Sequence, residues 1–303
     1  PENKLAKEAG LHLGVGNSIA VSASYQTSDP DIYAVGDAIG VTHLVSGKET
    51  LVPLAGPANK QGRLAAENAW GGHQAAQPVQ GSSVLKAFDL TAASTGLNEK
   101  QAKALGLPYR KTYIHPQSHA SYYPGATPIS MKMLFDGNGA ILGAQAIGYE
   151  GVEKRIDVLA TAIRLHGTVY DLEELELCYA PPFSSAKDPV NMLGFTAANI
   201  LKGDMPVYYA EDIPGLSPEG TTRLDVSTPA EFGMSTIPGY QNIPLDELRG
   251  RLSELDPNKP VYVTCRVGLR GYLATRILKQ HGFDAYNLSG GMKTYQLVRE
   301  TES

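Results

Sequence analysis

The pattern of apolar and polar residues divides the chain into three stretches. In the last third, Val261–Thr264 is a run of apolar and β-branched residues, which predicts a short buried strand. After a short loop, residues 271–281 predict a helix with Leu273, Ile277 and Leu278 on one face. A cysteine, Cys265, lies between this strand and the loop.

The middle stretch, residues 86–203, mixes strand-like alternation with helical periodicity. Residues 87–96 predict a strand and then a turn. The other expected strands are 111–115, 129–135 and 140–148, the last two joined through Asp-Gly-Asn-Gly. The expected helices are 97–105, capped by Asn98, and one in which Val152, Ile156, Leu159 and Ile163 make an apolar face.

The first stretch, residues 1–85, has weaker patterns. Ile19, Val21 and Ala23 alternate with smaller or polar residues and predict an edge strand, and residues 31–35 predict a short buried strand. A helix is expected to begin near Pro57. Small residues recur along it at four-three-four spacing, at Ala58, Gly62, Ala65 and Ala69.

Length, charge and cysteine content exclude several classes of protein. A chain of 303 residues predicts two or three domains. The net charge of −5 and the lack of a basic tract argue against a nucleic-acid partner. No apolar run approaches the ~18 residues of a membrane span, and no secretory signal is expected. Cys178 and Cys265 show no metal-ligand spacing, so we expect no metal site and a reducing, cytoplasmic location.

The surroundings of Cys265 are typical of a reactive thiol. A cysteine between a strand end and a helix start meets free backbone N–H groups and the positive end of the helix dipole, and both favour the thiolate. The spacing C-x4-R suits an anionic persulfide sulfur better than a tetrahedral phosphate. The loop after the cysteine consists of Arg266, Val267, Gly268, Leu269 and Arg270. The alternative is a structural cysteine buried before a surface turn.

The segments around Cys265 resemble the rhodanese (sulfurtransferase) family. They are RLDVSTPAEF at 223–232, IPGYQNIPLDEL at 237–248, CRVGLR at 265–270 and FDAYNLSGGMKTYQ at 283–296. The resemblance implies an α/β domain with a central parallel sheet over residues 204–303. It also implies that Cys265 accepts sulfur and that the amides of residues 266–270 hold the persulfide. The chain departs from the family pattern at Ser227, Ser235 and Thr236, which lie in the supporting shell.

The first stretch resembles the second flavin-binding motif of the pyridine nucleotide-disulfide oxidoreductases. The matching segments are TSDPDIYAVGDA at 27–38 and PLAGPANKQGR at 53–63. The resemblance implies that Gly36 and Asp37 meet the ribityl chain of FAD. It places the helix amino end against the flavin ring, through Leu54, Ala55, Pro57, Ala58 and Gln61. Taken alone, an aspartate such as Asp37 is more often a turn residue.

Other features of that family are absent from the sequence. The G-x-G-x-x-G motifs that hold FAD and NAD(P)H do not occur, and neither does the redox cysteine that follows the first of them. We therefore expect residues 1–85 to be the C-terminal portion of an FAD/NAD(P)-binding domain. We also expect this chain by itself to bind FAD poorly.

Residues 86–203 resemble the dimerisation domain of the same reductases, which packs on a partner subunit and completes its active site. Tyr122 and Tyr123 lie in one candidate loop, and Tyr179 lies in a proline-rich turn. Tyr179 and Ala180 stand where many family members have His-Glu. This pattern resembles the coenzyme A disulfide reductases, which use tyrosines from the partner. The alternative is that the tyrosines only pack.

The order of the three units matches a coenzyme A disulfide reductase fused to a rhodanese domain, with residues 202–218 as the expected linker. The resemblance implies an FAD-dependent, NAD(P)H-linked homodimer that reduces a coenzyme A disulfide or persulfide. The expected fold is mixed: α/β and α+β. Two other interpretations remain, a sulfurtransferase with a dimerisation region and a non-catalytic sulfur-binding module.

Overall fold

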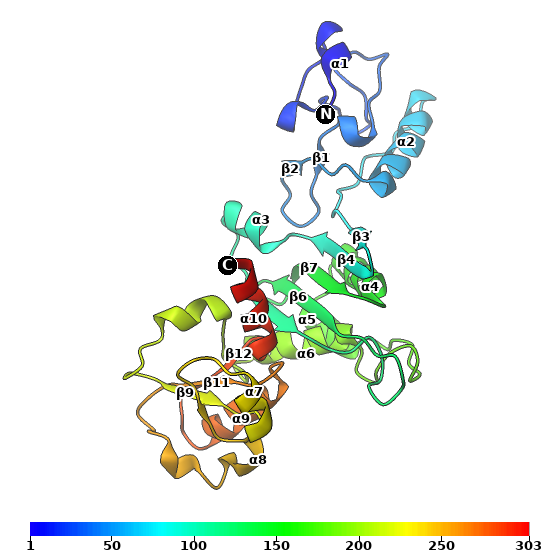
Figure 1. Ribbon diagram of the computed structural model, residues 1–303. Helices are drawn as coiled ribbons and strands as arrows, with labels where there is room; N and C mark the ends of the chain where they lie inside the picture. Colours follow the sequence, from blue (N-terminus) through cyan, green and yellow to red (C-terminus); the bar gives the residue numbers. More distant parts are fainter. Residues whose placement is uncertain (303) are drawn as a thin grey trace.

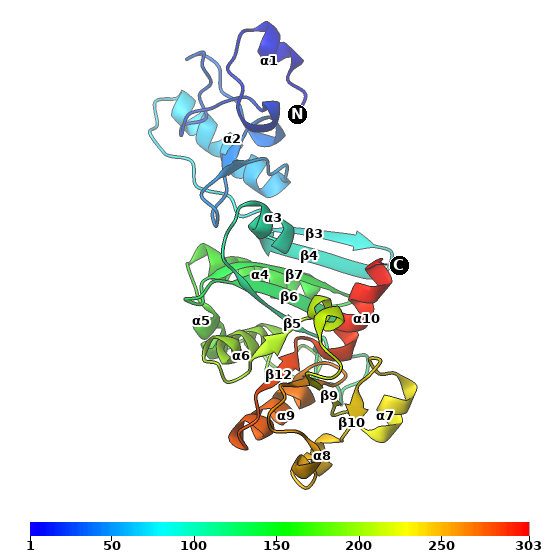
Figure 2. The same ribbon diagram turned by 90° about the vertical axis from the view of Figure 1, so that its left-hand side faces the viewer.

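The computed structural model describes residues 1–302, in which an N-terminal lobe, a central antiparallel sheet and a C-terminal parallel sheet follow one another (Figure 1). The lobe lies at one end of the molecule and the parallel sheet at the other. The last helix, α10 (Gly291–Glu302), runs from the parallel sheet towards the central sheet (Figure 2). The fold is therefore the expected mixture of α/β and α+β units.

The N-terminal lobe has little regular structure. Its elements are α1 (Lys4–Glu8), η1 (Val15–Asn17), η2 (Gly36–Ala38), β1 (Val41–Thr42), β2 (Glu49–Thr50) and α2 (Ala55–Ala69). The strands expected through Ile19 and over residues 31–35 are wrong, because both segments form only isolated bridges. Asn17 and Tyr25 have positive φ angles of 59° and 67°, and these break the extended path on either side of Ile19.

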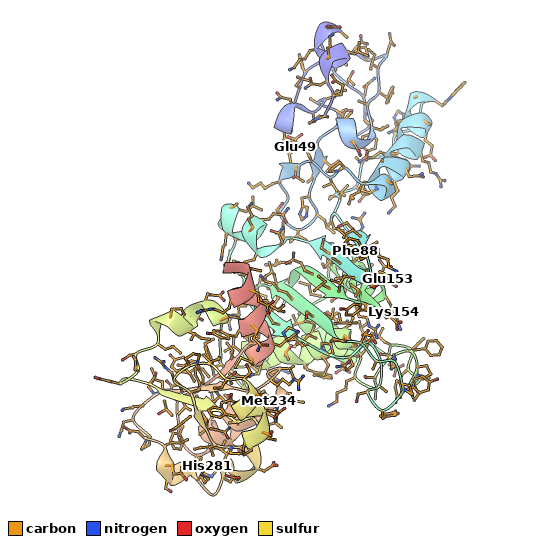
Figure 3. All side chains as sticks on the ribbon, in the orientation of Figure 1. Glu49, Phe88, Glu153, Lys154, Met234 and His281 are labelled. Carbon is orange, nitrogen blue, oxygen red and sulfur yellow. The ribbon has the colours of Figure 1, made fainter. Side chains whose placement is uncertain are left out.

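The central sheet has the strand order β3-β4-β7-β6-β5, with every neighbouring pair antiparallel. Its strands are β3 (Ser83–Ala87), β4 (Leu90–Gly96), β5 (Arg110–Ile114), β6 (Ile129–Phe135) and β7 (Ile141–Gly148). The expectation of a strand followed by a turn over residues 87–96 is wrong in order. Ala87 ends β3, the chain turns at Phe88, and β4 follows. Phe88 has a positive φ of 54° and lies exposed at this turn (Figure 3).

Helices cover one face of the central sheet, and the side chains packed between helices and sheet form the core of this unit. They are α4 (Val152–Arg164), α5 (Val169–Glu174) and α6 (Pro189–Leu201), while α3 (Glu99–Ala104) lies after β4. The predicted apolar face of α4 is buried against β4 and β7, as expected for an amphipathic helix. Asn98 caps α3 by accepting a hydrogen bond from the Gln101 backbone N–H at 2.8 Å.

The C-terminal sheet is parallel throughout, with the order β10-β9-β11-β12-β8. Its strands are β8 (Val207–Tyr208), β9 (Thr222–Asp225), β10 (Gln241–Asn242), β11 (Val261–Thr264) and β12 (Ala285–Leu288). Its helical segments besides α10 are η3 (Ala210–Gly215), α7 (Pro229–Met234), α8 (Leu245–Leu248), η4 (Leu252–Glu254) and α9 (Leu269–Gln280). The predicted strand at 261–264 is confirmed residue for residue.

Two expectations for this domain are wrong in detail. The linker expected at 202–218 contains β8, whose Tyr208 is buried and donates its hydroxyl to the Val263 carbonyl at 3.2 Å. Helix α9 begins at Leu269 rather than at residue 271, and Leu273 is exposed. The small residues Gly271 and Ala274 let the helix approach the sheet, which shifts its buried face away from Leu273.

A joint between edge strand β5 and the start of α10 connects the two sheets. The Tyr113 backbone N–H donates to the Ser289 hydroxyl at 3.1 Å, and His115 Nε2 lies 2.7 Å from Thr294 Oγ1. Beside them, the ammonium group of Lys111 pairs with Glu211 of η3 and, at 3.0 Å, with Glu99. Gly290 lies between these groups, has no side chain to crowd them, and adopts a positive φ of 73°.

We predict that Gly290→Ala loosens this joint. A Cβ at this position would overlap the Thr294 hydroxyl and lie 2.8 Å from Tyr113 Cβ. Overpacking of this kind costs about 1–3 kcal/mol. Gly282→Ala is the matched control, because Gly282 also has a positive φ (86°) but a Cβ added there would meet no heavy atom within 4 Å. Thermal unfolding should show a larger loss for Gly290→Ala, and equal losses would contradict the packing argument.

A second prediction concerns the pH dependence of the joint. Burial, assisted by the positive charge of Lys293, lowers the pKa of His115 from 6.5 to about 4. Between these values the unfolded chain binds a proton that the folded chain does not. The contribution of His115 to stability is therefore complete above pH 6.5 and falls as the pH is lowered towards 4. The unfolding temperature of wild type should fall more steeply over this window than that of His115→Gln, and parallel curves would refute the assignment.

Candidate functional site

Cys265 directly follows β11, and its sulfur is directed at backbone N–H groups. Sγ accepts hydrogen bonds from Gly268 N–H at 3.2 Å and from Gly271 N–H at 3.3 Å. Gly268 is the N-cap of α9 with a φ of 97°, so the amino end of the helix faces the sulfur. The cysteine is 1 % exposed. This arrangement stabilises negative charge on sulfur through backbone dipoles.

The loop after Cys265 is shorter than expected. Leu269 and Arg270 belong to the first turn of α9, so only residues 266–268 are irregular. One of the two N–H groups at Sγ comes from Gly271, which lies just outside the expected cradle of amides at 266–270.

Neighbouring elements fix the loop through its carbonyl groups. The Asn287 side-chain amide donates to the Gly268 carbonyl at 3.1 Å. The Met292 N–H donates to the Cys265 carbonyl at 2.8 Å, and the Lys293 N–H donates to the Arg266 carbonyl at 3.0 Å. With its carbonyls held outward, the loop keeps its N–H groups directed at the sulfur. Neither Asn287 nor the start of α10 was recognised from the sequence as part of the site.

The side chains of the loop differ in their surroundings. Arg266, Val267 and Leu269 are exposed. Arg270 instead makes a bidentate ion pair with Glu231 of α7, at 2.6 and 2.9 Å. The hydrogen bond from Arg270 is the main reason that the pKa of Glu231 falls to about 2. The positive charge of Arg270 is thus matched by a carboxylate.

The supporting shell around Asp225 accommodates the departures from the rhodanese pattern. Asp225 is buried at the end of β9. Its Oδ1 accepts from the Ser227 backbone N–H at 2.9 Å, and its Oδ2 accepts from the Thr236 hydroxyl at 3.0 Å. Ser235 lies further out and accepts from Gln296 at 3.1 Å. The buried carboxylate is therefore satisfied by the residues that this chain has.

The tyrosine loops lie beyond the central sheet, away from the N-terminal lobe (Figure 1). The Tyr122 and Tyr179 hydroxyls are 2.8 Å apart, and both side chains are exposed. Tyr123 instead packs edge-on against His119, with ring centroids 5.8 Å apart. The bond from Tyr122 is the main cause of a raised Tyr179 pKa, so Tyr179 stays protonated at neutral pH. The structure thus brings Tyr122, and not Tyr123, to Tyr179.

In the N-terminal lobe, the candidate flavin residues gather at the amino end of α2. The Gly36 N–H donates to Gln61 Oε1 at 2.6 Å, and a Cβ on Gly36 would lie 3.6 Å from Ala58 Cβ. Leu54 is the N-cap of α2, and Ala55 and Pro57 lie in its first turn. Asp37 is exposed, and no ion pair or hydrogen bond engages its carboxylate within residues 1–302.

The start of α2 fits an oxygen-rich ligand. Among the described residues no side chain caps this helix, and its first turn has no acidic residue. Uncapped N–H groups and a free carboxylate nearby are suited to the carbonyl and hydroxyl oxygens of a flavin. A cavity of about 280 Å³ borders residues 51–54 just before the helix.

The candidate residues form separate groups in one chain. Cys265 belongs to the parallel sheet, the tyrosines to loops of the central unit, and Asp37 to the N-terminal lobe (Figures 1 and 2). No cluster of three or more His, Cys, Asp or Glu side chains within residues 1–302 could hold a metal ion. In the same part of the chain, no helix has the length and apolar character needed to cross a membrane.

Family models match two parts of the chain. Residues 83–189 match the pyridine nucleotide-disulphide oxidoreductase dimerisation domain, and residues 215–297 match the rhodanese-like domain. Among curated relatives, an NADH oxidase of Methanocaldococcus jannaschii is 37 % identical over 63 % of this chain and 43 % of its own length. A coenzyme A disulfide reductase of Staphylococcus aureus is 35 % identical over 65 % of this chain and 45 % of its own.

Two solved structures share nearly the whole fold. Reduced CoADR-RHD of Bacillus anthracis has a TM-score of 0.96 and 48 % identity, covering 99 % of this chain and 54 % of that one. A NAD-dependent persulfide reductase from A. fulgidus has a TM-score of 0.88 and 39 % identity, covering 97 % and 54 %. The chain thus spans about half the length of the proteins it matches. Its fold and both domain matches show that this chain contains a pyridine nucleotide-disulphide oxidoreductase dimerisation domain followed by a rhodanese-like domain.

Proposed function

We propose that the complete protein is an FAD-dependent, NAD(P)H-linked homodimer that reduces a coenzyme A disulfide or persulfide, and that Cys265 carries sulfane sulfur. The observation that supports this best is the pair of N–H groups at Cys265 Sγ. The hydroxyl contact between Tyr122 and Tyr179 in the same chain supports the reductase half. Related proteins named coenzyme A disulfide reductase and persulfide reductase support the substrate class.

In the sulfur-transfer half, the thiolate of Cys265 attacks the outer sulfur of an anionic donor such as thiosulfate or a persulfide. The sulfur–sulfur bond of the donor breaks, and its leaving group departs with the electron pair as sulfite or a thiolate. Cys265 becomes a persulfide, and an acceptor nucleophile then removes the outer sulfur and restores the thiolate. The N–H groups of Gly268 and Gly271 stabilise negative charge on sulfur at each stage.

In the reductase half, the residues at the start of α2 would hold the flavin. FAD, when bound, would supply electron transfer from NAD(P)H to a disulfide. Asp37 would accept hydrogen bonds from ribityl hydroxyls, with Gly36 giving the close backbone approach. The stretch from Leu54 to Gln61 would lie against the ring, its N–H groups facing the carbonyl oxygens.

The tyrosine pair would act in the active site of the partner subunit. A protonated Tyr179 hydroxyl is a hydrogen-bond donor to a coenzyme A thiolate, and it can give that thiolate a proton as it leaves. Tyr122 accepts or donates the second hydrogen bond and so orients Tyr179. Tyr123 has no such contact with Tyr179, and we assign it no part in the proton transfer.

The domain boundaries that we propose are 1–85, 86–203 and 204–303. The last boundary places β8 in the rhodanese unit, in agreement with its pairing to β12. Cys178 and Cys265 are both free thiols, which is consistent with the proposed reducing cytoplasm. The hydrogen bonds at Asp225 favour an active sulfurtransferase over a non-catalytic sulfur-binding module.

We predict that Cys265→Ala abolishes sulfur transfer from thiosulfate to cyanide, because the nucleophile is lost. Cys178→Ala is the matched control, since it removes the other free thiol, which is exposed and lies outside the rhodanese unit. Thiocyanate production should fall to background in the first variant and stay at the wild-type rate in the second. Thiocyanate formation by Cys265→Ala at the wild-type rate would rule out Cys265 as the sulfur carrier.

We also predict that Tyr179→Phe slows coenzyme A disulfide turnover by the complete protein. The expected loss is about 10²-fold, because a positioned proton donor is removed. Tyr123→Phe should turn over normally, and both variants should keep wild-type sulfur transfer at Cys265. A normal rate for Tyr179→Phe would reject the hydroxyl as the acid. Complete protein with sulfur transfer but no reductase activity would instead favour the sulfurtransferase alone.

A further inference from the structure

Arg155 is a buried charge below the tyrosine loops. It lies on α4 and is 2 % exposed. Its guanidinium donates to the Ser118 carbonyl at 2.9 Å, to Asp188 Oδ2 at 3.0 Å and to Ser184 Oγ at 3.3 Å. A further N–H donates to the Gly151 carbonyl at 3.1 Å. One side chain therefore connects three segments of the chain.

Two of these segments are the bases of the loops that hold the tyrosines. Ser118 precedes Tyr122 in one loop, and Ser184 follows Tyr179 in the other. The loops also touch directly, because the Ala120 N–H donates to the Ser184 carbonyl at 2.9 Å. Above this base, the Tyr122 and Tyr179 hydroxyls meet at 2.8 Å.

The hydroxyl contact cannot hold the two loops together by itself. Both tyrosines are exposed, and water competes for a hydrogen bond between exposed hydroxyls. The bonds at Arg155 are charge-assisted and shielded from water, so they are the stronger constraint. The geometry of the tyrosine pair therefore depends on the buried guanidinium.

We propose that Arg155 is the positioning residue of the tyrosine pair, holding the two loops at the separation that lets Tyr122 and Tyr179 share a hydrogen bond. The catalytic meaning of this role rests on the function proposed above for Tyr179. The geometric role stands separately on the contacts of Arg155.

The fork of arginine is needed because the acceptors lie on different segments. A lysine ammonium has three donors on one atom and cannot reproduce the planar spread of five. The packing is also specific to Gly151, since a Cβ there would overlap the guanidinium. Asp188 has a second task, because its Oδ1 caps α6 by accepting from Val190 N–H at 3.0 Å.

The test is oxidative cross-linking of the tyrosines, which reports their proximity without any reductase activity. Light, a ruthenium trisbipyridyl complex and persulfate couple adjacent tyrosine rings into dityrosine, and peptide mass spectrometry maps the link. The 303-residue chain is used with Tyr123→Phe, so that Tyr122 alone represents its loop. The internal reference is the link between Tyr262 and Tyr286. Their rings stack in the parallel-sheet domain, with ring centroids 5.3 Å apart.

The variants compared are Arg155→Lys and its matched control Arg164→Lys. Arg164 lies on the same helix but is exposed and donates to the Pro78 carbonyl at 2.7 Å, away from the tyrosine loops. Arg155→Lys should reduce the 122–179 link relative to the reference about fivefold, because one ammonium cannot hold both loops. Arg164→Lys should leave the ratio unchanged.

A merely structural role would lower the unfolding temperature of Arg155→Lys but leave the ratio of links at wild type in the folded protein, and that result overturns the proposal. If Arg155→Lys does not fold, Ser184→Ala decides, because it removes one acceptor without leaving a buried charge unpaired. An unchanged ratio in that variant also overturns the proposal.

The role proposed for Tyr179 can fail independently. In the complete protein, a normal turnover by Tyr179→Phe would remove the catalytic meaning of the pair. The loss of the 122–179 link in Arg155→Lys would still establish the positioning. Loss of both the link and coenzyme A disulfide turnover in Arg155→Lys, with sulfur transfer at Cys265 intact, supports the two proposals together.

Discussion

The C-terminal half of the molecule depends on the contacts that the first turn of α10 makes with the Cys265 loop and with the central sheet. The N–H groups of this turn hold the carbonyls of Cys265 and Arg266, and its Thr294 hydroxyl meets His115 of the central sheet. Gly291 allows the closest approach, since a Cβ there would crowd the Val267 and Gly268 amides at 2.9 and 2.8 Å. The same helix turn therefore shapes the sulfur site and joins it to the unit that holds the tyrosines.

The elements that can be predicted from sequence are those whose patterns are local. The strand at 261–264 has four apolar or β-branched residues and a buried place, and the structure confirms its bounds. Helix α4 is predicted from its periodicity for the same reason. The two-residue strand β8 could not be predicted, because only its pairing with β12 makes it a strand. The expected strand through Ile19 fails in the opposite way, since no extended neighbour pairs with it beyond single bridges.

In the candidate site, too, local motifs are predictable from the sequence and long-range contacts are not. Cys265 and the tyrosines are identified from their motifs, whereas the residues that hold them in place come from distant segments. Asn287 reaches the Cys265 loop from β12, and Arg155 reaches both tyrosine loops from α4. The choice between Tyr122 and Tyr123 also lies beyond the sequence, because neighbours in an irregular loop have no fixed periodicity. Thr236 shows that a departure from a family pattern is compensated locally, because its hydroxyl donates a hydrogen bond to the Asp225 carboxylate.

The ion pair between Arg270 and Glu231 has a consequence for how the sulfur site meets its donors. Because the guanidinium is neutralised by its partner, the attraction for an anionic sulfur comes mainly from peptide dipoles, which act only at contact. The exposed Arg266 beside Cys265 then supplies the remaining long-range attraction for anionic donors, and dissolved salt screens this attraction. The rate of encounter is then set by diffusion, by this screened attraction and by the fit at the mouth of the loop.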